Sequence, residues 1–397
     1  MVENKKVILA FSGGLDTTFC VVYLKEKGYD VVTATINTGG FDEKTLAEIE
    51  EKAKKLGSIR HYNVDAEEKI YSQIIQYLIK LNGLYENDYP IMCADRYVIA
   101  QEILAIAEKE NCKAVAHGST SIGNDQVRFD SAFLTLKNDV EIICPIKELN
   151  ITRDDEIEYL KERGLDIDVK SKKYSINHNI FGTTVSGSEI DDNKEPDFTA
   201  YNLTVIDKNL TTDSFEYLNI DFEKGIPVSL NNKKMNGLQI LKQLNKIVGR
   251  YGYGSRIYIG DCIIGIKGRI MFEAPGLFVL LKAHRKLEQI TLTKEQQNFN
   301  KYVSQYWADL VYSGMYYEPL VRNLEIYSNS VQEKVTGGVK VKVILNKIEV
   351  IEIFSPNSLI RDDIATYAQK SSWTSQEADG FIKFHSLPQV LSNLPRK

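Results

Sequence analysis

Residues 7–18 read Val-Ile-Leu-Ala-Phe-Ser-Gly-Gly-Leu-Asp-Thr-Thr, an apolar run that leads through two glycines into a helix-like stretch closing at Gly28. A strand, a glycine turn and a helix in this order aim backbone N–H groups and the helix dipole at a phosphate. Gly13 and Gly14 carry no Cβ, so the backbone can approach a ligand closely. The same segment holds three hydroxyl donors: Ser12, Thr17 and Thr18. The sequence therefore predicts a phosphate-binding loop directly after the first strand.

This loop lacks the Gly-Lys-Ser/Thr of a Walker A motif, so it is not built to transfer a γ-phosphate. Asp16 would repel bare phosphate, and we interpret it as a Mg²⁺ contact or a helix cap. The alternative is an ordinary strand–helix turn, which an isolated Ser-Gly-Gly would suit better than this longer motif. The pattern SGGxD[ST] resembles the pyrophosphate loop of N-type ATP pyrophosphatases, which split ATP between its α- and β-phosphates.

Strand and helix patterns alternate through the N-terminal part of the chain. Expected strands are Lys6–Phe11, Val31–Asn37, Arg60–Val64, Ala114–His117 and Glu141–Cys144. Expected helices are Leu15–Lys27, Glu43–Leu56, Glu67–Leu81, Arg96–Glu110 and Arg153–Arg163. This alternation predicts an α/β fold with a doubly wound parallel sheet. In such sheets ligands bind beyond the carboxyl ends of the strands, at the topological switch point.

The pattern changes after residue 169, where the stretch 170–197 is rich in Ser, Asn, Gly and Asp and loses its periodicity. We expect a nucleotide-binding domain at 1–169, a mixed α+β domain at 170–361 and a C-terminal arm at 362–397. Expected strands of the second domain are Ile220–Phe222, Ile257–Ile259, Cys262–Lys267, Leu277–Leu281 and a hairpin of Val339–Leu345 with Glu349–Phe354. Expected helices are Gly237–Val248 and Lys294–Ser313.

Composition limits the class of protein. The length of 397 residues suggests two or three domains, and the net charge of −5 gives no nucleic-acid footprint. Residues 1–6 lack the apolar core of a signal peptide, and no apolar run approaches the length of a membrane helix. The five cysteines are scattered without a Cys-x-x-Cys pair. Reduced thiols in a cytoplasmic protein are therefore expected, rather than disulfides or a zinc site.

A second polar cluster follows the expected strand at Ala114–His117 and so lies at the same ligand edge. Residues 117–129 read His-Gly-Ser-Thr-Ser-Ile-Gly-Asn-Asp-Gln-Val-Arg-Phe, which combines glycines, hydroxyls, amides, a carboxylate and a guanidinium. The alternative is a surface turn capped by Asn124 and Asp125. A turn of that kind rarely needs such a mixture of groups, so we expect a ligand-binding loop.

Together these two loops resemble argininosuccinate synthase. The likeness continues, in order, through segments spread over nearly the whole chain: Tyr85–Arg96, residues 174–177, Gly265–Lys267, Phe272–Pro275, Ala283–His284, Thr291–Thr293 and Val335–Gly337. Members of that family condense citrulline with aspartate and split ATP to AMP and pyrophosphate. The resemblance implies ATP and Mg²⁺ as cofactors. It also implies a homotetramer in which the C-terminal arm wraps a neighbouring subunit. Neither a nucleic acid nor a membrane is expected as a partner.

The resemblance also assigns roles to residues. The ATP site would comprise Ala10, Ser12, Gly13, Gly14, Asp16, Thr17, Thr18, Ile36 and Gly118. Aspartate would be held by Thr120, Asn124 and Asp125. Citrulline would be held by Arg128 at its carboxylate, with Tyr89, Ser175 and Thr184 as further contacts. Ile36 could equally be a core residue, and Tyr89 and Ser175 could have core or capping roles. We expect Asp16, Asp125 and Arg128 to matter most for the chemistry.

Two departures from the family pattern affect the acceptor substrate. Gly260 stands where the family usually has a glutamate that holds the citrulline ammonium, and Phe272 stands where it usually has a tyrosine. An uncharged, bulkier α-nitrogen would fit such a site, as in the branch of the family that uses N-acetyl- or N-succinylcitrulline. Alternatively Asp261 or Glu189 moves in and ordinary citrulline binds. Ser121-Ile122 also replaces the usual Gly-Lys, and a serine contact near Cys93 is missing.

Two other functions compete with this one. The chain could be another N-type ATP pyrophosphatase, such as an amide-forming ligase or a tRNA-modifying enzyme, but its acidic balance argues against this. It could also be a catalytically silent nucleotide-binding protein, which the altered acceptor pocket would permit.

Overall fold

The first half of the molecule is built on a parallel sheet. The computed structural model describes residues 5–395 apart from 122, 166–173, 193 and 197–205. Five parallel strands run in the order β3-β2-β1-β4-β5. Their bounds are Lys5–Ala10 (β1), Tyr29–Asn37 (β2), Arg60–Asp65 (β3), Ala114–Ala116 (β4) and Glu141–Ile143 (β5). The switch point of the sheet lies between β1 and β4, so the loops after these two strands meet there.

Helices cover both faces of this sheet. They are Leu15–Glu26 (α1), Glu43–Lys55 (α2), Asp95–Lys109 (α5), Asn124–Leu136 (α6), Pro145–Leu149 (α7) and Arg153–Lys161 (α8). Val7 and Leu9 of β1 share one hydrophobic cluster with Phe19 of α1. Ile8, between them, belongs to a separate cluster with Val98 of α5. Because successive strand side chains point to opposite faces, the two clusters confirm the doubly wound arrangement.

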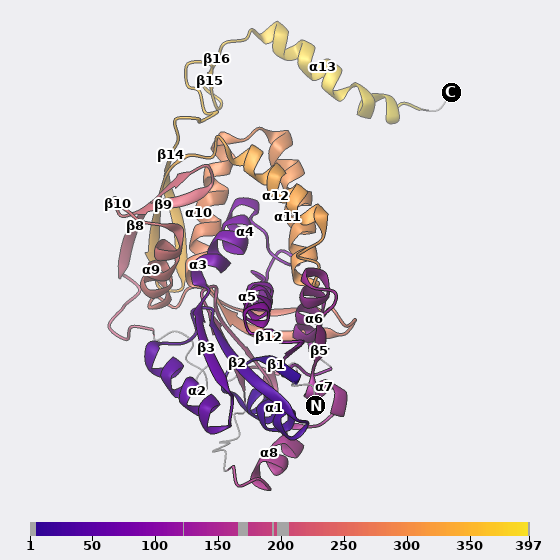
Figure 1. Cartoon of the computed structure of the whole chain (residues 1–397). Coiled ribbons are helices and arrows are strands. Elements are labelled where there is room, and N and C mark those ends of the chain that lie inside the picture. Colours follow the sequence, from indigo (N-terminus) through magenta and orange to yellow (C-terminus); the bar gives the residue numbers. More distant parts are fainter. Residues whose placement is uncertain (1–4, 122, 166–173, 193, 197–205, 396–397) are drawn as a thin grey trace.

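The helix expected at Glu67–Leu81 is divided into three parts: α3 at Glu67–Ile70, a π-helical turn at Tyr71–Ile75 and α4 at Gln76–Leu81. Figure 1 shows purple α4 lying among orange helices of the second half. The hydrophobic core that contains α4 is continuous across both halves of the chain. The two halves therefore form one packed body.

Two further sheets make up the second half. The first is an antiparallel sheet of order β11-β12-β7-β6. Its strands are Ser175–Asn179 (β6), Gly182–Ser186 (β7), Ser255–Asp261 (β11) and Lys267–Glu273 (β12). A second antiparallel sheet comprises Phe215–Glu223 (β8), Ile226–Leu230 (β9), Lys233–Lys234 (β10), Gly337–Ile344 (β13) and Lys347–Phe354 (β14). The accompanying helices are Gly237–Gly249 (α9), Pro275–Thr291 (α10), Lys294–Tyr312 (α11) and Pro319–Gln332 (α12).

Several local expectations were wrong. Leu277–Leu281 lies inside α10, because Pro275 at the first helical position starts a helix that a short apolar run cannot distinguish from a strand. Cys262–Lys267 is mostly the turn between β11 and β12, with Gly265 at a φ of 83°. The polar cluster at 117–129 is only partly a loop, since α6 begins at Asn124. The expected domain boundary at 169/170 and Ile122 lie outside the described residues.

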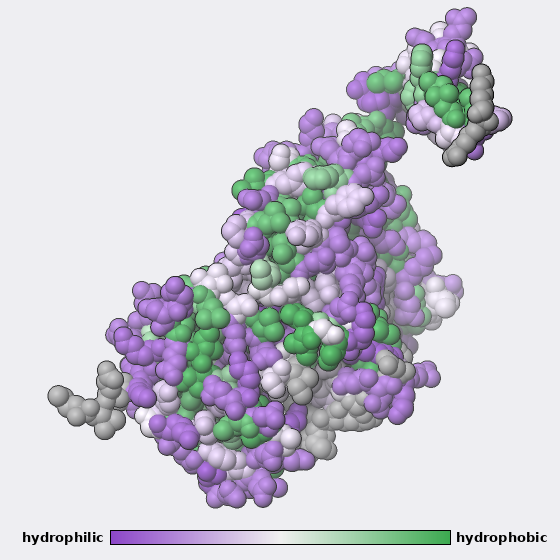
Figure 2. Space-filling model, turned by 90° about the vertical axis from the view of Figure 1, so that its right-hand side faces the viewer, coloured by the Kyte–Doolittle hydropathy of each residue, from purple (hydrophilic) through white to green (hydrophobic). Residues whose placement is uncertain are grey.

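The C-terminal segment stands away from the body (Figure 1). It consists of Ala365–Thr366 (β15), Lys370–Ser371 (β16) and Ser375–Ser392 (α13), and none of the residues of α13 is buried. Its large apolar side chains are exposed, including Tyr367 at 99% and Phe384 at 74%. Figure 2 shows green, hydrophobic atoms among purple ones on the part that projects from the body at the top right. Such a surface on a lone segment is typical of a contact with another chain.

Among the described residues, no helix combines the length and the apolar character needed to cross a bilayer. The five cysteines are free thiols.

Candidate active site

A cavity of about 510 Å³ lies between the two loops of the parallel sheet and one face of the β11-β12-β7-β6 sheet. Nine of the residues predicted for the site line it: Asp16, Tyr89, Gly118, Thr120, Asn124, Asp125, Arg128, Ser175 and Thr184. The structure thus brings together, in one space, residues that are spread from position 16 to position 184.

The loop after β1 is held in place by its own hydroxyls. Thr18 Oγ1 donates to the carbonyl oxygen of Gly14 at 2.6 Å, and Ser12 Oγ lies 3.3 Å from Thr17 Oγ1. Gly13 has a φ of 74°, a left-handed conformation that favours glycine. Lys52 Nζ of α2 donates to the Gly13 carbonyl at 2.7 Å. The N-terminus of α1 thus follows a hydrogen-bonded loop and has no side-chain cap, which leaves its first-turn N–H groups free to bind an anion.

The second loop packs directly on the first. A Cβ added to Gly118 would lie 3.3 Å from Asp16 Cβ and 3.4 Å from Thr17 Cγ2, so a larger residue would push the loops apart. The loop is anchored from behind by His117, whose Nε2 lies 2.7 Å from Asp130 Oδ1 of α6. Lys147 of α7 donates to the other oxygen of Asp130 at 2.6 Å. These contacts explain why glycine follows histidine at this point.

Asp16 shares its surroundings with a second carboxylate, Glu156 of α8. Burial, followed by the neighbouring Asp16, raises the pKa of Glu156 to about 8. Burial also raises the pKa of Asp16, against the opposing effect of Arg153. Glu156 is 2% exposed, and its Oε2 atom has no hydrogen-bond partner. Two crowded carboxylates of this kind suit a divalent cation, because hard cations prefer oxygen ligands and relieve their repulsion. Sequence reasoning identified Asp16 and missed Glu156.

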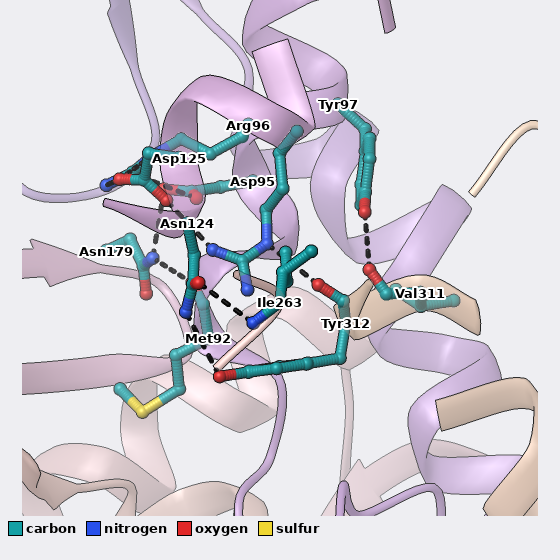
Figure 3. A network of polar contacts seen from close by, with 11 residues as sticks. Met92, Asp95, Arg96, Tyr97, Asn124, Asp125, Asn179, Ile263, Val311 and Tyr312 are labelled. Atoms are coloured by element: carbon teal, nitrogen blue, oxygen red, sulfur yellow. Dashed lines mark hydrogen bonds and ion pairs between the residues drawn. The ribbon is translucent and has the colours of Figure 1, made fainter. Parts of the chain in front are cut away.

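The opposite end of the cavity is dominated by Asp125, which pairs with two guanidinium groups (Figure 3). Its Oδ1 accepts from Arg128 Nη1 at 3.0 Å, and its Oδ2 accepts from Arg96 Nε at 3.0 Å. Burial works to raise the pKa of Asp125, but Arg96 and Arg128 outweigh it and hold the pKa below its usual value. The carboxyl group is therefore ionised, and with 37% of its side chain exposed it still presents an edge to the cavity.

Arg128 retains one unused donor. Its Nε donates to the Tyr312 carbonyl at 3.0 Å, its guanidinium lies 4.8 Å from the centre of the Tyr312 ring, and its Nη2 is buried without a partner. A buried, unsatisfied guanidinium N–H is costly unless a ligand accepts from it. A carboxylate is the natural acceptor for that donor.

Asn124 connects the two walls of the cavity. Its amide accepts from the Ile263 N–H at 3.0 Å and donates to the Tyr312 hydroxyl at 3.2 Å (Figure 3). Ile263 belongs to the turn between β11 and β12, and Tyr312 ends α11. Asn124, which was predicted to contact aspartate, thus also links the first turn of α6 to the second half of the chain through hydrogen bonds.

The sheet wall carries the predicted acceptor contacts from β6 and β7, with Ser175 on β6 and Thr184 on β7. Thr184 is paired with Phe272 of β12. Phe272 is fully buried, with its ring 5.4 Å from that of Tyr89, so it lies behind the cavity lining. Gly260 is also buried, and a Cβ on it would overlap Glu86 and Tyr258. The predicted positions Ala10, Ser12, Gly13, Gly14, Thr17, Thr18 and Ile36 lie at or behind the first loop rather than in this cavity.

Besides Glu156, four side chains in or beside the cavity were not identified from the sequence: Arg96, Tyr258, Tyr312 and Glu86. Arg96, Tyr258 and Tyr312 line the cavity, and Glu86 is hydrogen-bonded to Tyr258. Arg96 falls within the Tyr85–Arg96 segment that drew attention, so its charge was an available signal. Tyr258 and Tyr312 come from segments with no motif of their own, and only the fold brings them near Tyr89.

For the substrates that the resemblance implies, we expect the Asp125→Asn variant to raise the KM for aspartate at least about tenfold, because asparagine keeps one acceptor oxygen but loses the second acceptor and the charge that suits an ammonium. The KM for citrulline should rise as well, since Arg128 loses its anionic partner. The KM for ATP should stay within about twofold. Steady-state kinetics with each substrate varied in turn provide the measurement. An equal rise for all three substrates would indicate collapse of the loop instead.

Two family models match the chain in succession. The arginosuccinate synthase N-terminal HUP domain matches residues 6–166, and the arginosuccinate synthase C-terminal domain matches residues 174–392. Argininosuccinate synthase of Xylella fastidiosa is 41% identical over 393 residues, covering 98% of this chain and 97% of that protein. The proteins of the same name from Methanocaldococcus jannaschii and Pyrococcus furiosus are 39% and 40% identical, each over 98% of this chain and over 98% and 94% of their own lengths.

Proposed function

This chain belongs to the argininosuccinate synthase family, and from that premise we propose that its cavity joins a citrulline-type acceptor to aspartate in two steps. In the first, the ureido oxygen of the acceptor attacks the α-phosphate of ATP, and pyrophosphate leaves. In the second, the amino group of aspartate attacks the ureido carbon, and AMP leaves with the oxygen. The observation that carries this proposal is that Asp16, in the first helical turn after the glycine loop, and the Asp125–Arg128 pair line the same cavity.

The chemistry needs positioning and charge stabilisation more than a nucleophilic side chain. A ureido oxygen is a weak nucleophile and a poor leaving group, and adenylation turns it into a good one. The reacting groups must be held in line while charge develops on the phosphates. The N-terminus of α1 offers backbone N–H groups for the pyrophosphate, and Gly118 allows the second loop to approach the nucleotide.

Mg²⁺ would be held at Asp16, with Glu156 as its second carboxylate. The support is the half-buried Asp16 beside the buried Glu156, whose Oε2 atom has no hydrogen-bond partner. Bound there, the ion would neutralise the charge of the leaving pyrophosphate. The two carboxylates that would bind the ion are held in place by helices, Asp16 by α1 and Glu156 by α8.

At the other end of the cavity, the unpartnered Nη2 of Arg128 supports a contact with the acceptor carboxylate. The ionised Asp125, together with Thr120 and Asn124, supports a site for aspartate, whose ammonium would meet the open edge of the Asp125 carboxylate. Tyr89, Ser175 and Thr184 would complete the acceptor site from the sheet side.

Incubation with ATP labelled at its α-phosphate tests this function. AMP and pyrophosphate should accumulate only when both a ureido acceptor and aspartate are present, and a product containing both should form. An amide-forming or tRNA-modifying enzyme would release AMP without the ureido acceptor. A silent nucleotide-binding protein would release none, and either result would overturn the proposal.

We further infer that the chain consists of an ATP-binding domain (1–169), a synthetase domain (170–361) and a C-terminal arm (362–397). In a homotetramer, this arm would wrap a neighbouring subunit. The support is that α13 buries no residue on its own chain. We expect truncation after Phe354 to lower the oligomeric state while the body stays folded. Sedimentation velocity and circular dichroism provide the measurement. An unchanged oligomer would remove the arm from this account.

A further inference from the structure

A second cavity, of about 560 Å³, lies on the reverse face of the sheet that walls the candidate active site. Successive side chains of a strand point to opposite faces, so Ser175 and Thr184 face the first cavity, whereas His178 and Thr183 line the second. The loop after β2, at Gly39-Gly40, and helix α9 border the other sides. The second cavity thus opens away from the candidate active site, at the seam between the two halves of the chain.

Three side chains form a row across this face of the sheet. The strand register pairs His178 of β6 with Thr183 of β7, and Thr183 with Glu273 of β12. His178 Nδ1 lies 2.6 Å from Thr183 Oγ1, so these two side chains are hydrogen-bonded to each other. Glu273, at the end of the row, is left without such a contact.

Glu273 is a buried acid without a counterpart. It is 4% exposed, its Oε2 atom has no hydrogen-bond partner, and no cationic side chain in the described part of the chain pairs with it. Burial alone raises the pKa of Glu273 to about 7. A buried carboxyl group of this kind is costly unless it stays protonated or a ligand brings a cation to it. The floor of the cavity therefore suits a positively charged group.

The mouth of the cavity carries the opposite charge. Lys246 of α9 lines the cavity and is exposed, and it has no carboxylate partner within the described ranges of the chain. Arg250, at the end of the same helix, is occupied by an ion pair with Glu216. Lys246 is thus available to an anionic group of a ligand whose other end reaches the floor.

This separation of charges selects a class of ligand. A cation must reach the buried Glu273, while a carboxylate remains at the mouth beside Lys246. Gly182 and Pro275, which also line the cavity, have no polar side chain and suit a stretch of methylene groups between the two charges. A flexible apolar chain with an ammonium at one end and a carboxylate at the other is the chemistry of a basic amino acid.

We propose that this second cavity binds a basic amino acid of the lysine type, with its side-chain ammonium on Glu273 and its α-carboxylate on Lys246. The site lies outside the cavity proposed for the synthase reaction, and its occupation does not require that reaction.

Isothermal titration of the full-length protein with three probes tests the site: L-lysine, L-norleucine, which lacks only the terminal amino group, and 6-aminohexanoate, which lacks only the α-amino group. L-Lysine and 6-aminohexanoate should bind with similar Kd. L-Norleucine should bind at least about tenfold more weakly, because it leaves Glu273 unpaired. Glu273→Gln should weaken L-lysine binding by the same factor, and Lys246→Met by about two- to fivefold, since its charge is exposed.

Control variants separate this site from the rest of the molecule. Lys242→Met removes a lysine of the same helix, one that pairs with Glu67, and should leave L-lysine binding unchanged. Arg128→Lys alters only the first cavity and should leave it unchanged too. Loss of binding in Arg128→Lys but not in Glu273→Gln would place the ligand in the first cavity and overturn the inference.

Thermal unfolding without ligand separates lost binding from lost folding. Glu273→Gln should be at least as stable as the wild type, because the change removes an unpartnered buried carboxyl group. If that variant fails to fold, the comparison of L-lysine with L-norleucine on the wild-type protein still decides. Equal affinity for these two probes, or no binding of L-lysine, would refute the site.

Discussion

The Asp16→Asn variant is expected to lose about 10²- to 10³-fold in kcat, because it removes an anionic ligand from the point where charge develops on the leaving pyrophosphate. Asp16→Ala should be at least as severe. The Asp16→Asn variant without ligands should be as stable as the wild type or more so, since the change removes a half-buried carboxylate that crowds the buried Glu156. Steady-state product formation tests the expected loss of kcat. Thermal unfolding of the protein without ligands tests the expected stability.

Glu43→Gln is the matched control for Asp16. Glu43 lies in the first turn of α2, as Asp16 lies in the first turn of α1, but it is exposed and far from the two loops in sequence. Its removal costs a similar helix-dipole interaction, about 0.3–1 kcal/mol, without touching the cavity. Near-normal adenylate formation in Asp16→Asn would show that Asp16 is only a helix-terminal charge.

The second large effect is expected for Arg128→Ala. Its guanidinium is 3% exposed and pairs with Asp125, so its loss leaves a carboxylate with Arg96 alone and removes the contact proposed for the acceptor carboxylate. Truncating one member of a buried ion pair costs about 3–5 kcal/mol, so the protein should unfold at a lower temperature. The kcat/KM for citrulline should fall by about 10²- to 10³-fold or more.

Arg128→Lys separates the two consequences. Lysine keeps the charge beside Asp125 and should recover much of the stability, but a single ammonium cannot replace the fork that bonds Asp125, the Tyr312 carbonyl and a substrate at once. We expect the citrulline KM to remain raised in Arg128→Lys, with the ATP KM nearly normal. Full recovery of citrulline binding by lysine would contradict a bidentate role for this arginine.

The sequence predicted the parallel sheet well because its signals are local. Most strands of the first half are short, largely apolar runs followed within a few residues by a helix, and the glycine loop after β1 shows where the ligand edge lies. The second half was harder to predict. The apolar run Leu277–Leu281 fits a buried strand and a buried helix equally, and only the sixteen-residue continuation after Pro275 decides between them.

The residues of the site likewise differ in whether local sequence patterns could indicate them. Asp16, Gly118, Asp125 and Arg128 belong to two continuous sequence motifs, each a loop that leads into a helix, so these motifs indicated them directly. Glu86 and Tyr258 are separated by 172 positions, and their contact depends on how β11 passes the turn at Tyr85–Tyr89. Because local patterns carry no information on such a contact, the sequence alone could not show that side chains from two other segments occupy the space beside Gly260.

The overlap at Gly260 also has a consequence for how this sequence could have changed over time. Glu86, Tyr258 and Gly260 occupy one volume, so a substitution at any one of them is acceptable only in the presence of particular residues at the other two. A side chain could be added at position 260 only if the Tyr258 hydroxyl and the Glu86 carboxylate moved aside or were replaced. Descendants of this chain should therefore exchange the three positions as a set, and hybrids that combine one position from a relative with two from this chain should be the least active of all.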